Sequence, residues 1–121
     1  MSVPEWLGIA AFGAIGAVAR FSVDALVSSR VGGGLPFGTL TVNLMGALVL
    51  GVLVGAVIDP GVYRLAGTAL LGAYTTFSTW MLETHRLAEE GQLRNAAANV
   101  LVSLFAGLAV AALGRSLGGM L

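Results

Sequence analysis

The sequence predicts an all-α membrane protein with four transmembrane helices, and composition and charge spacing carry that prediction. Of the 121 residues, 57% are hydrophobic and only 10% are charged, whereas a soluble domain usually carries about 25% charged residues. A membrane helix needs about 20 mostly apolar residues, and charge-free runs occupy 6–19, 31–58, 65–82 and 95–114. We therefore expect one domain over residues 1–121, with helices at about 5–28, 37–58, 64–88 and 94–117.

Composition also excludes several classes of protein. Six arginines balance six acidic residues, so the net charge is zero and a basic nucleic-acid binder is excluded. The absence of cysteine excludes a disulfide framework and thiol catalysis. The single histidine, His85, cannot form a histidine-rich metal site, and no phosphate loop, dinucleotide fingerprint or Ser-His-Asp set is present. We expect no enzyme activity.

The first predicted helix contains a charged pair, Arg20 and Asp24, one turn apart on one face. A buried arginine costs about 2.5–3.5 kcal/mol before pairing. Two roles fit Arg20: it reaches the interface and pairs with Asp24, or it lines a permeation pathway. Residues 17–19 resemble a signal-peptide cleavage site, but residues 1–5 contain no basic side chain, so we expect the helix to be retained.

The second predicted helix carries Asn43 midway along it, one turn after Thr39. An asparagine amide offers two N–H donors and one carbonyl acceptor. Asn43 either joins helices or directs a donor toward an anion. Gly51 and Gly55 form a GxxxG pair, and such small residues let membrane helices approach closely. The wider distribution of glycine predicts an oligomer.

The third predicted helix has the most informative pattern, because four serine and threonine residues fall within residues 75–79. Such side chains bond to nearby backbone and compete with the helix. We expect this helix to break mid-membrane; the alternative is a continuous helix with its hydroxyls bonded to its own carbonyls. A break would free carbonyls that coordinate a hard cation. Phe77 and Trp80 share a face, either as ordinary packing or as ring edges along a path.

The fourth predicted helix places Asn99 and Ser103 on one face. We interpret Glu83, His85 and Glu89, at the end of the third helix, as a solvated helix end. No acid then lies mid-span, which argues against a carboxylate proton relay. The remaining intramembrane groups are uncharged donors and aromatic edges, which suit a small anion better than a cation.

Arginine counts give almost no orientation signal. Cytoplasmic loops usually carry the excess of Lys and Arg. Arg64 and Arg115 fall on one side of a four-helix layout, whereas Arg30, Arg86 and Arg94 fall on the other. Charge alone fits either a weak single preference or insertion in both orientations.

Three segments together make the chain resemble the Fluc/CrcB fluoride channels. They are residues 16–20, residues 38–46 with Thr39-Leu40-Thr41-Val42-Asn43, and residues 72–80 with Thr75-Thr76-Phe77-Ser78-Thr79. Residues 103–107 fit less specifically, and the length and layout agree over essentially the whole chain. The resemblance implies passive, fluoride-selective efflux through antiparallel dual-topology dimers in the inner membrane, each with two pores and a central structural sodium ion.

The resemblance also implies roles for individual residues. The sodium-coordinating backbone carbonyls correspond to Gly72 and Thr75. Arg20 and Thr39 are candidates for a vestibule or structural role. At Trp80 and Asn99 the family usually has Phe and Tyr, so these two positions depart from its pattern. The expected fluoride-pore residues are Asn43, Phe77, Thr79, Trp80, Asn99 and Ser103.

Three alternatives remain at this stage. The departures at Trp80 and Asn99 also fit one subunit of a heterodimeric fluoride channel, in which a paralogue supplies a second pore. A small multidrug transporter shares the four-helix layout but needs a deep carboxylate. A non-transporting assembly subunit would explain the glycines, although not Asn43 together with residues 75–79.

Overall fold

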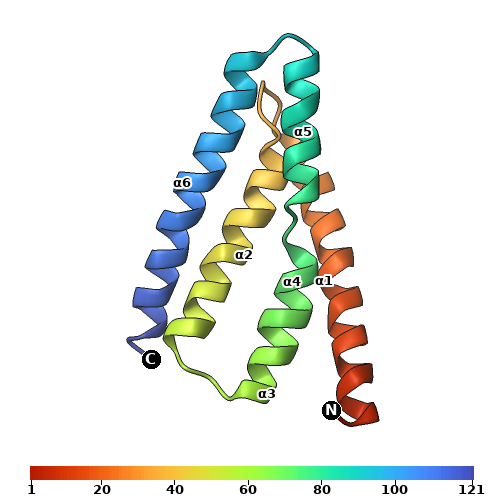
Figure 1. Ribbon diagram of the computed structural model, residues 1–121, viewed down its shortest axis with the longest axis vertical. Coiled ribbons are helices and arrows are strands. Elements are labelled where there is room, and N and C mark those ends of the chain that lie inside the picture. The colour runs from red at the N-terminus through yellow and green to blue at the C-terminus, as the bar shows by residue number, and fades with distance from the viewer.

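The computed structural model describes residues 1–121 and is an all-helical bundle without strands (Figure 1). The helices are α1 (Val3–Arg30), α2 (Phe37–Gly55), α3 (Pro60–Tyr63), the π-helical segment η1 (Arg64–Leu71), α4 (Gly72–Tyr74), α5 (Ser78–Glu89) and α6 (Leu93–Gly118). Helical backbone runs without a gap through α3, η1 and α4. The chain therefore passes along the bundle four times, and both termini lie at the same end (Figure 1).

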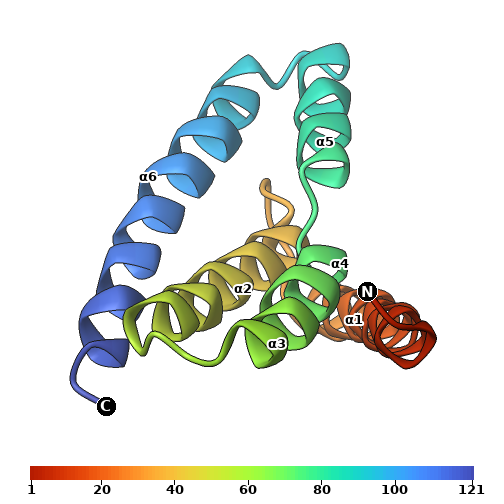
Figure 2. The same cartoon turned by 60° about the horizontal axis from the view of Figure 1, so that its bottom comes forward.

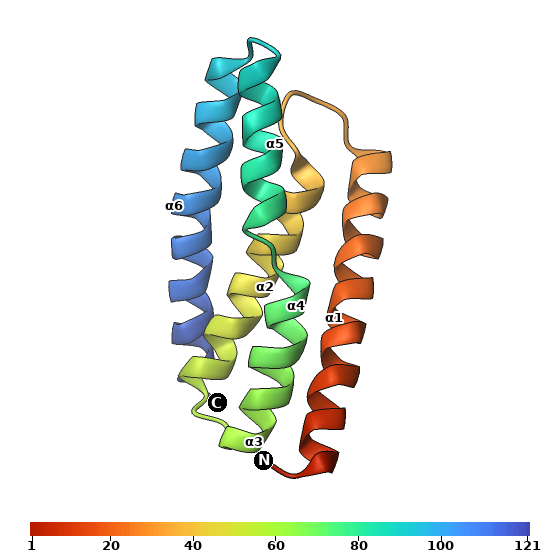
Figure 3. The same ribbon diagram turned by 45° about the vertical axis from the view of Figure 1, so that its right-hand side comes forward.

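Three helices, α1, α2 and α6, are long and apolar enough to cross a membrane. The remaining pass consists of α3, η1, α4 and α5, and residues 75–77 separate α4 from α5. Figure 3 shows this separation partway along the pass, between the two ends of the bundle. All four predicted helical regions are present, although their ends differ from the predicted ones.

The largest differences in helix bounds lie around the second connection. The second helix ends at Gly55 rather than 58, and Val57 has a positive φ of 51°. Residues 60–63, which the predicted bounds leave between the second and third helices, form α3. The Asp59 carboxylate accepts hydrogen bonds from the N–H groups of Gly61 and Val62, and Pro60 occupies the first turn. This is a strong N-terminal capping arrangement.

Small residues allow close contact between α2 and α6. A Cβ added at Gly51 would press on the Ala111 carbonyl, and one added at Gly114 would press on the Leu48 carbonyl. Gly55 and Gly118 continue the same contact. Such surfaces suit lipid, where helices associate by packing and not by a hydrophobic drive. The GxxxG pair is therefore used within the subunit.

The α5–α6 hairpin forms the other main feature of the bundle. Figure 2 shows α5 and α6 meeting at residues 90–92 and diverging from α2 toward that end. Helix α6 packs on both α2 and α5, and its close glycine contacts with α2 lie toward its C-terminal end. This arrangement positions the site described below.

Enlarging Gly114 should destabilise the bundle. Gly114→Ala adds a Cβ against the Leu48 carbonyl, so we expect a loss of about 1–3 kcal/mol in the free energy of unfolding. The matched control is Gly107→Ala on the same helix, where nothing lies within 4 Å of the added Cβ. Thermal unfolding in detergent measures both, and equal stability of the two variants would contradict the packing argument.

Candidate functional site

The site is built around the interruption between α4 and α5. Thr75 adopts extended backbone with φ −81° and ψ 159°, and helix resumes at Ser78. Hydroxyl groups secure both sides of the interruption, as expected for residues that compete with helical bonds. Thr75 Oγ1 donates to the Leu71 carbonyl at 3.0 Å, and Thr76 Oγ1 accepts from the Thr79 N–H at 3.2 Å. The second contact satisfies an N–H group in the first turn of α5.

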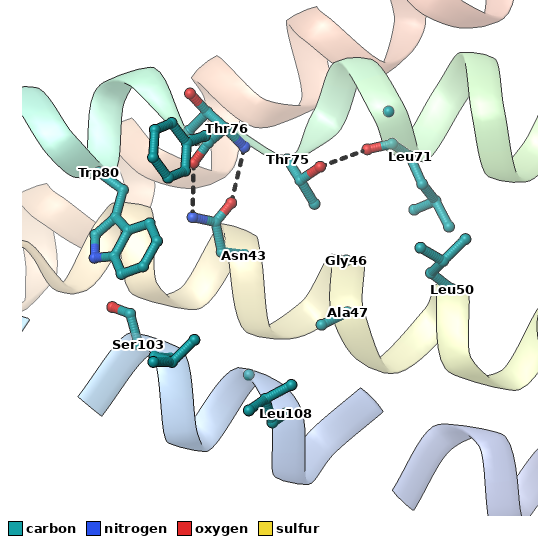
Figure 4. Close-up of a pocket in the computed structure, with 14 residues that line it drawn as sticks. Asn43, Gly46, Ala47, Leu50, Leu71, Thr75, Thr76, Trp80, Ser103 and Leu108 are labelled. Atoms are coloured by element: carbon teal, nitrogen blue, oxygen red, sulfur yellow. Dashed lines mark hydrogen bonds between the residues drawn. The ribbon is translucent and has the colours of Figure 1, made fainter. Parts of the chain in front are cut away.

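Asn43 of α2 holds the interruption through two hydrogen bonds. Its Oδ1 accepts from the Thr76 backbone N–H at 2.9 Å, and its Nδ2 donates to the Thr76 carbonyl at 2.9 Å (Figure 4). The side-chain amide thus satisfies both backbone groups of one residue outside the helix. An amide has two N–H donors, and this pairing uses only one of them.

Other backbone groups at the interruption have no protein partner. The carbonyl groups of Gly72 and Thr75 accept no hydrogen bond, and the N–H groups of Phe77 and Ser78 donate none. Gly72, Phe77 and Ser78 are exposed in the single subunit, and Thr75 is half-buried. These groups therefore provide acceptors on the α4 side and donors at the start of α5.

A cavity of about 410 Å³ lies beside the interruption, between α2, the η1–α4 segment and α6. Its polar groups come from Asn43, Thr75, Thr76 and Ser103, and none of its lining residues is charged. The two aromatic rings are Phe77 and Trp80, whose centroids lie 5.6 Å apart with planes at 87°. Figure 4 shows Ser103 and Trp80 on the α6 and α5 sides of this space. Phe77 is 70% exposed in the single subunit.

A second, more polar cavity of about 320 Å³ lies between α1, α2 and the start of α5. Arg20 and Asp24 from α1, Thr39 from α2, and Thr76 and Thr79 line it. The Arg20–Asp24 ion pair, one of the two roles that the sequence left open for Arg20, is absent, since the salt bridges join other residues.

Glu83 departs from the predicted solvated helix end. It is half-buried, and its carboxylate accepts a hydrogen bond from the Thr39 hydroxyl. The prediction is therefore wrong for Glu83, because α5 faces α2 at this level. His85 and Glu89, by contrast, are exposed and pair with each other.

The structure divides the expected site residues into three groups. The first cavity gathers Asn43, Gly72, Thr75, Phe77, Trp80 and Ser103. The second gathers Arg20, Thr39 and Thr79. Asn99 lines neither cavity: it is 3% exposed, and its amide donates to the Thr84 hydroxyl at 2.8 Å.

Sequence reasoning did not single out Thr76 or Thr84. Thr76 lines both cavities and carries the backbone groups that pair with Asn43. Its place in the run of hydroxyl residues was the only signal available. Thr84 lies outside that run, so nothing in the one-dimensional pattern distinguishes it from a surface residue.

Comparison with known proteins agrees with this geometry. The family model described as "CrcB-like protein, Camphor Resistance (CrcB)" matches residues 7–115. The chain belongs to the CrcB family. This CrcB protein is 53% identical over 116 residues to "Fluoride-specific ion channel FluC 2" of Mycolicibacterium paratuberculosis, covering 96% of this chain and 95% of the relative.

Two further relatives of this CrcB protein extend the comparison. It is 50% identical over 115 residues to "Fluoride-specific ion channel FluC 2" of Mycobacterium tuberculosis strain H37Rv, covering 95% of this chain and 91% of the relative. It is 44% identical over 120 residues to "Fluoride-specific ion channel FluC 1" of Symbiobacterium thermophilum, covering 94% and 97%. Together with the three long apolar helices, these matches make the chain a membrane protein of an ion-channel family.

Replacing Asn43 by an acid should destabilise this CrcB protein. In Asn43→Asp the donor to the Thr76 carbonyl is replaced by an oxygen, which repels that carbonyl. We expect a loss of about 1–3 kcal/mol in the free energy of unfolding. Asn95→Asp is the matched control, because its amide only donates to Gln92 one turn away. Thermal unfolding that is unchanged in Asn43→Asp would contradict the role of this pair.

Proposed function

We propose that this chain forms a fluoride-selective channel that lets fluoride leave the cell passively. The observation that carries the proposal is the uncharged first cavity at the helix interruption. There, an Asn43 N–H without a protein partner faces a space shared by two aromatic rings and the Ser103 hydroxyl.

This set of groups matches the chemistry of a small anion. Amide and hydroxyl donors and the positive edges of aromatic rings stabilise an anion that has shed part of its water. The N–H groups of Phe77 and Ser78 add donors at the N-terminus of α5, where the helix dipole favours negative charge. A charged residue in the cavity would hold the ion too tightly for rapid exit, and none is present there.

The family match favours a channel over the two rival classes. Relatives named fluoride-specific ion channels are 44–53% identical to this chain. A proton-coupled drug transporter needs a carboxylate in its binding cavity, and the first cavity contains none. A non-transporting assembly subunit gives no reason for a polar site at the helix interruption.

Truncating Phe77 should abolish fluoride transport without disturbing the subunit. Because the ring is 70% exposed in the subunit, Phe77→Ala removes few packing contacts, so we expect folding to persist. We expect fluoride efflux from liposomes to fall at least about tenfold, the effect of losing about 1.4 kcal/mol. A fluoride electrode measures the efflux, with chloride as the comparison ion.

The matched control is Phe105→Ala. Phe105 is 64% exposed and lines neither cavity, so its truncation should leave efflux near the wild-type rate. Equal efflux from Phe77→Ala and the wild-type chain would contradict the pore assignment. Wild-type liposomes that pass neither ion would contradict a channel formed by this chain alone.

We further propose an antiparallel dual-topology dimer in the cell inner membrane. Near-even arginine counts on the two sides and the exposed Phe77 ring beside the first cavity support a partner in the opposite orientation. The relatives named FluC 1 and FluC 2 keep a heterodimer with a paralogue as the second candidate. Efflux from the purified chain alone separates the two.

Both orientations should be detectable in cells. The chain has no cysteine, so Gly32→Cys places one thiol in the first connection, where the added Cβ meets nothing within 4 Å. Without a charge bias that fixes orientation, an impermeant maleimide should label about half of the copies from outside. Labelling of nearly all copies or nearly none would contradict dual topology.

We also propose that the backbone carbonyls of Gly72 and Thr75 hold a sodium ion at the dimer centre. The lack of any hydrogen bond to these oxygens supports the assignment, because unpaired carbonyls are suitable ligands for a hard cation. The cation would offset their desolvation and would not be transported.

Removing sodium should therefore weaken the assembly. At constant ionic strength, we expect thermal stability and fluoride efflux both to fall when an impermeant organic cation replaces sodium. Potassium is the matched inorganic control. Identical unfolding temperatures in the three salts would contradict a structural sodium site.

A further inference from the structure

A closed ring of three hydrogen bonds joins α5 to α6 beside the first cavity. The Trp80 Nε1–H donates to the Asn99 backbone carbonyl at 3.1 Å. The Asn99 side-chain amide donates to the Thr84 hydroxyl at 2.8 Å. That hydroxyl donates in turn to the Trp80 backbone carbonyl at 2.8 Å. Asn99 is 3% exposed, so water does not compete for its bonds.

The ring of bonds determines which part of Trp80 faces the cavity. The indole N–H is the only donor that tryptophan carries, and α6 engages it. Figure 4 shows the six-membered ring of Trp80 on the side toward Asn43 and the indole nitrogen on the opposite side. Trp80 therefore contributes the carbon edge of its ring to the cavity, and its N–H points away from the cavity toward α6.

The Asn99 and Thr84 side chains fix this arrangement although neither lines the cavity. Their mutual hydrogen bond sets the position of α6 along α5, and that position keeps the Asn99 carbonyl opposite the indole nitrogen. Removing the Thr84 hydroxyl leaves the Asn99 amide buried without its acceptor, which costs more than the bond itself contributes. We expect α6 to shift relative to α5 in response.

We propose that Asn99 and Thr84 are positioning residues for permeation, which keep the Trp80 N–H out of the anion path and its ring edge within it. The inference rests on the proposed channel function. A free indole N–H would form a charge-assisted hydrogen bond with fluoride, which is stronger than a contact with a ring edge. Such a bond would retain the ion and slow its exit.

Fluoride efflux from liposomes tests the inference with Thr84→Val, Trp80→Phe and the double variant. We expect Thr84→Val to lower efflux about three- to tenfold, the effect of one mispositioned hydrogen bond. Trp80→Phe keeps an aromatic edge at the cavity and removes the N–H, so its own efflux rate is the reference for the double variant. In the double variant, Thr84→Val should lose most of its effect.

Two controls separate positioning from general damage. Thr68→Val is the matched control, because Thr68 is exposed and far from α5 in the chain. The second readout is the indole N–H resonance of Trp80, read in a Trp6→Phe background that leaves one tryptophan. Thr84→Val should shift this resonance and speed its exchange with solvent, whereas Thr68→Val should do neither.

Each outcome decides the inference. An equal loss of efflux on Thr84→Val with and without Trp80→Phe would make the contact merely structural and overturn it. An unchanged indole resonance in Thr84→Val would overturn it whatever the efflux. Absence of fluoride efflux from the wild-type chain would instead refute a channel formed by this chain alone and, with it, a role of these residues in its permeation. The resonance would still report whether the hydrogen bond to the indole N–H is present.

Discussion

The paired hydrogen bonds between the Asn43 side chain and the Thr76 backbone are the constraint on which the rest of the site depends. Inside a membrane, backbone groups released from a helix have no water to bond. Asn43 supplies one donor and one acceptor, as the backbone of a neighbouring β-strand would. Each of the two hydrogen bonds is 2.9 Å long. With Thr76 held, helix α5 restarts at Ser78, and the backbone groups on either side remain available to ions.

The surrounding packing allows one side chain, Asn43, to hold the helix interruption. Glycines on α2 and α6 bring those helices together at one end of the bundle, while α5 holds α6 at the other end. The interruption is therefore flanked on both sides by continuous helices. The cavity that results is uncharged, whereas the charged and acidic groups, Arg20, Asp24 and Glu83, lie on the side of α1 and the loops. Under the proposed function, this separation lets an anion be attracted without being trapped.

Much of this arrangement was predictable from the sequence, because four largely apolar stretches separated by short polar segments indicate four passes. The run of hydroxyl residues after Gly72 also marked the site. Other features depend on which helix faces which, and a single sequence does not contain that information. Asn99 illustrates the limit: its spacing from Ser103 predicts a shared face, yet it bonds to Thr84 and Trp80 and not to the cavity. Glu83 shows the same limit. Its place near the end of a helix predicts exposure to solvent, yet its carboxylate bonds to Thr39 on another helix.

Amide hydrogen exchange across residues 74–80 of the purified protein tests the central constraint most directly. If Asn43 holds the interruption, the Thr76 N–H exchanges slowly, and the Phe77 and Ser78 N–H groups exchange at least about tenfold faster. Slow exchange at all three residues would indicate a continuous helix, and fast exchange at all three would indicate that Asn43 does not hold Thr76. Either result would contradict the account.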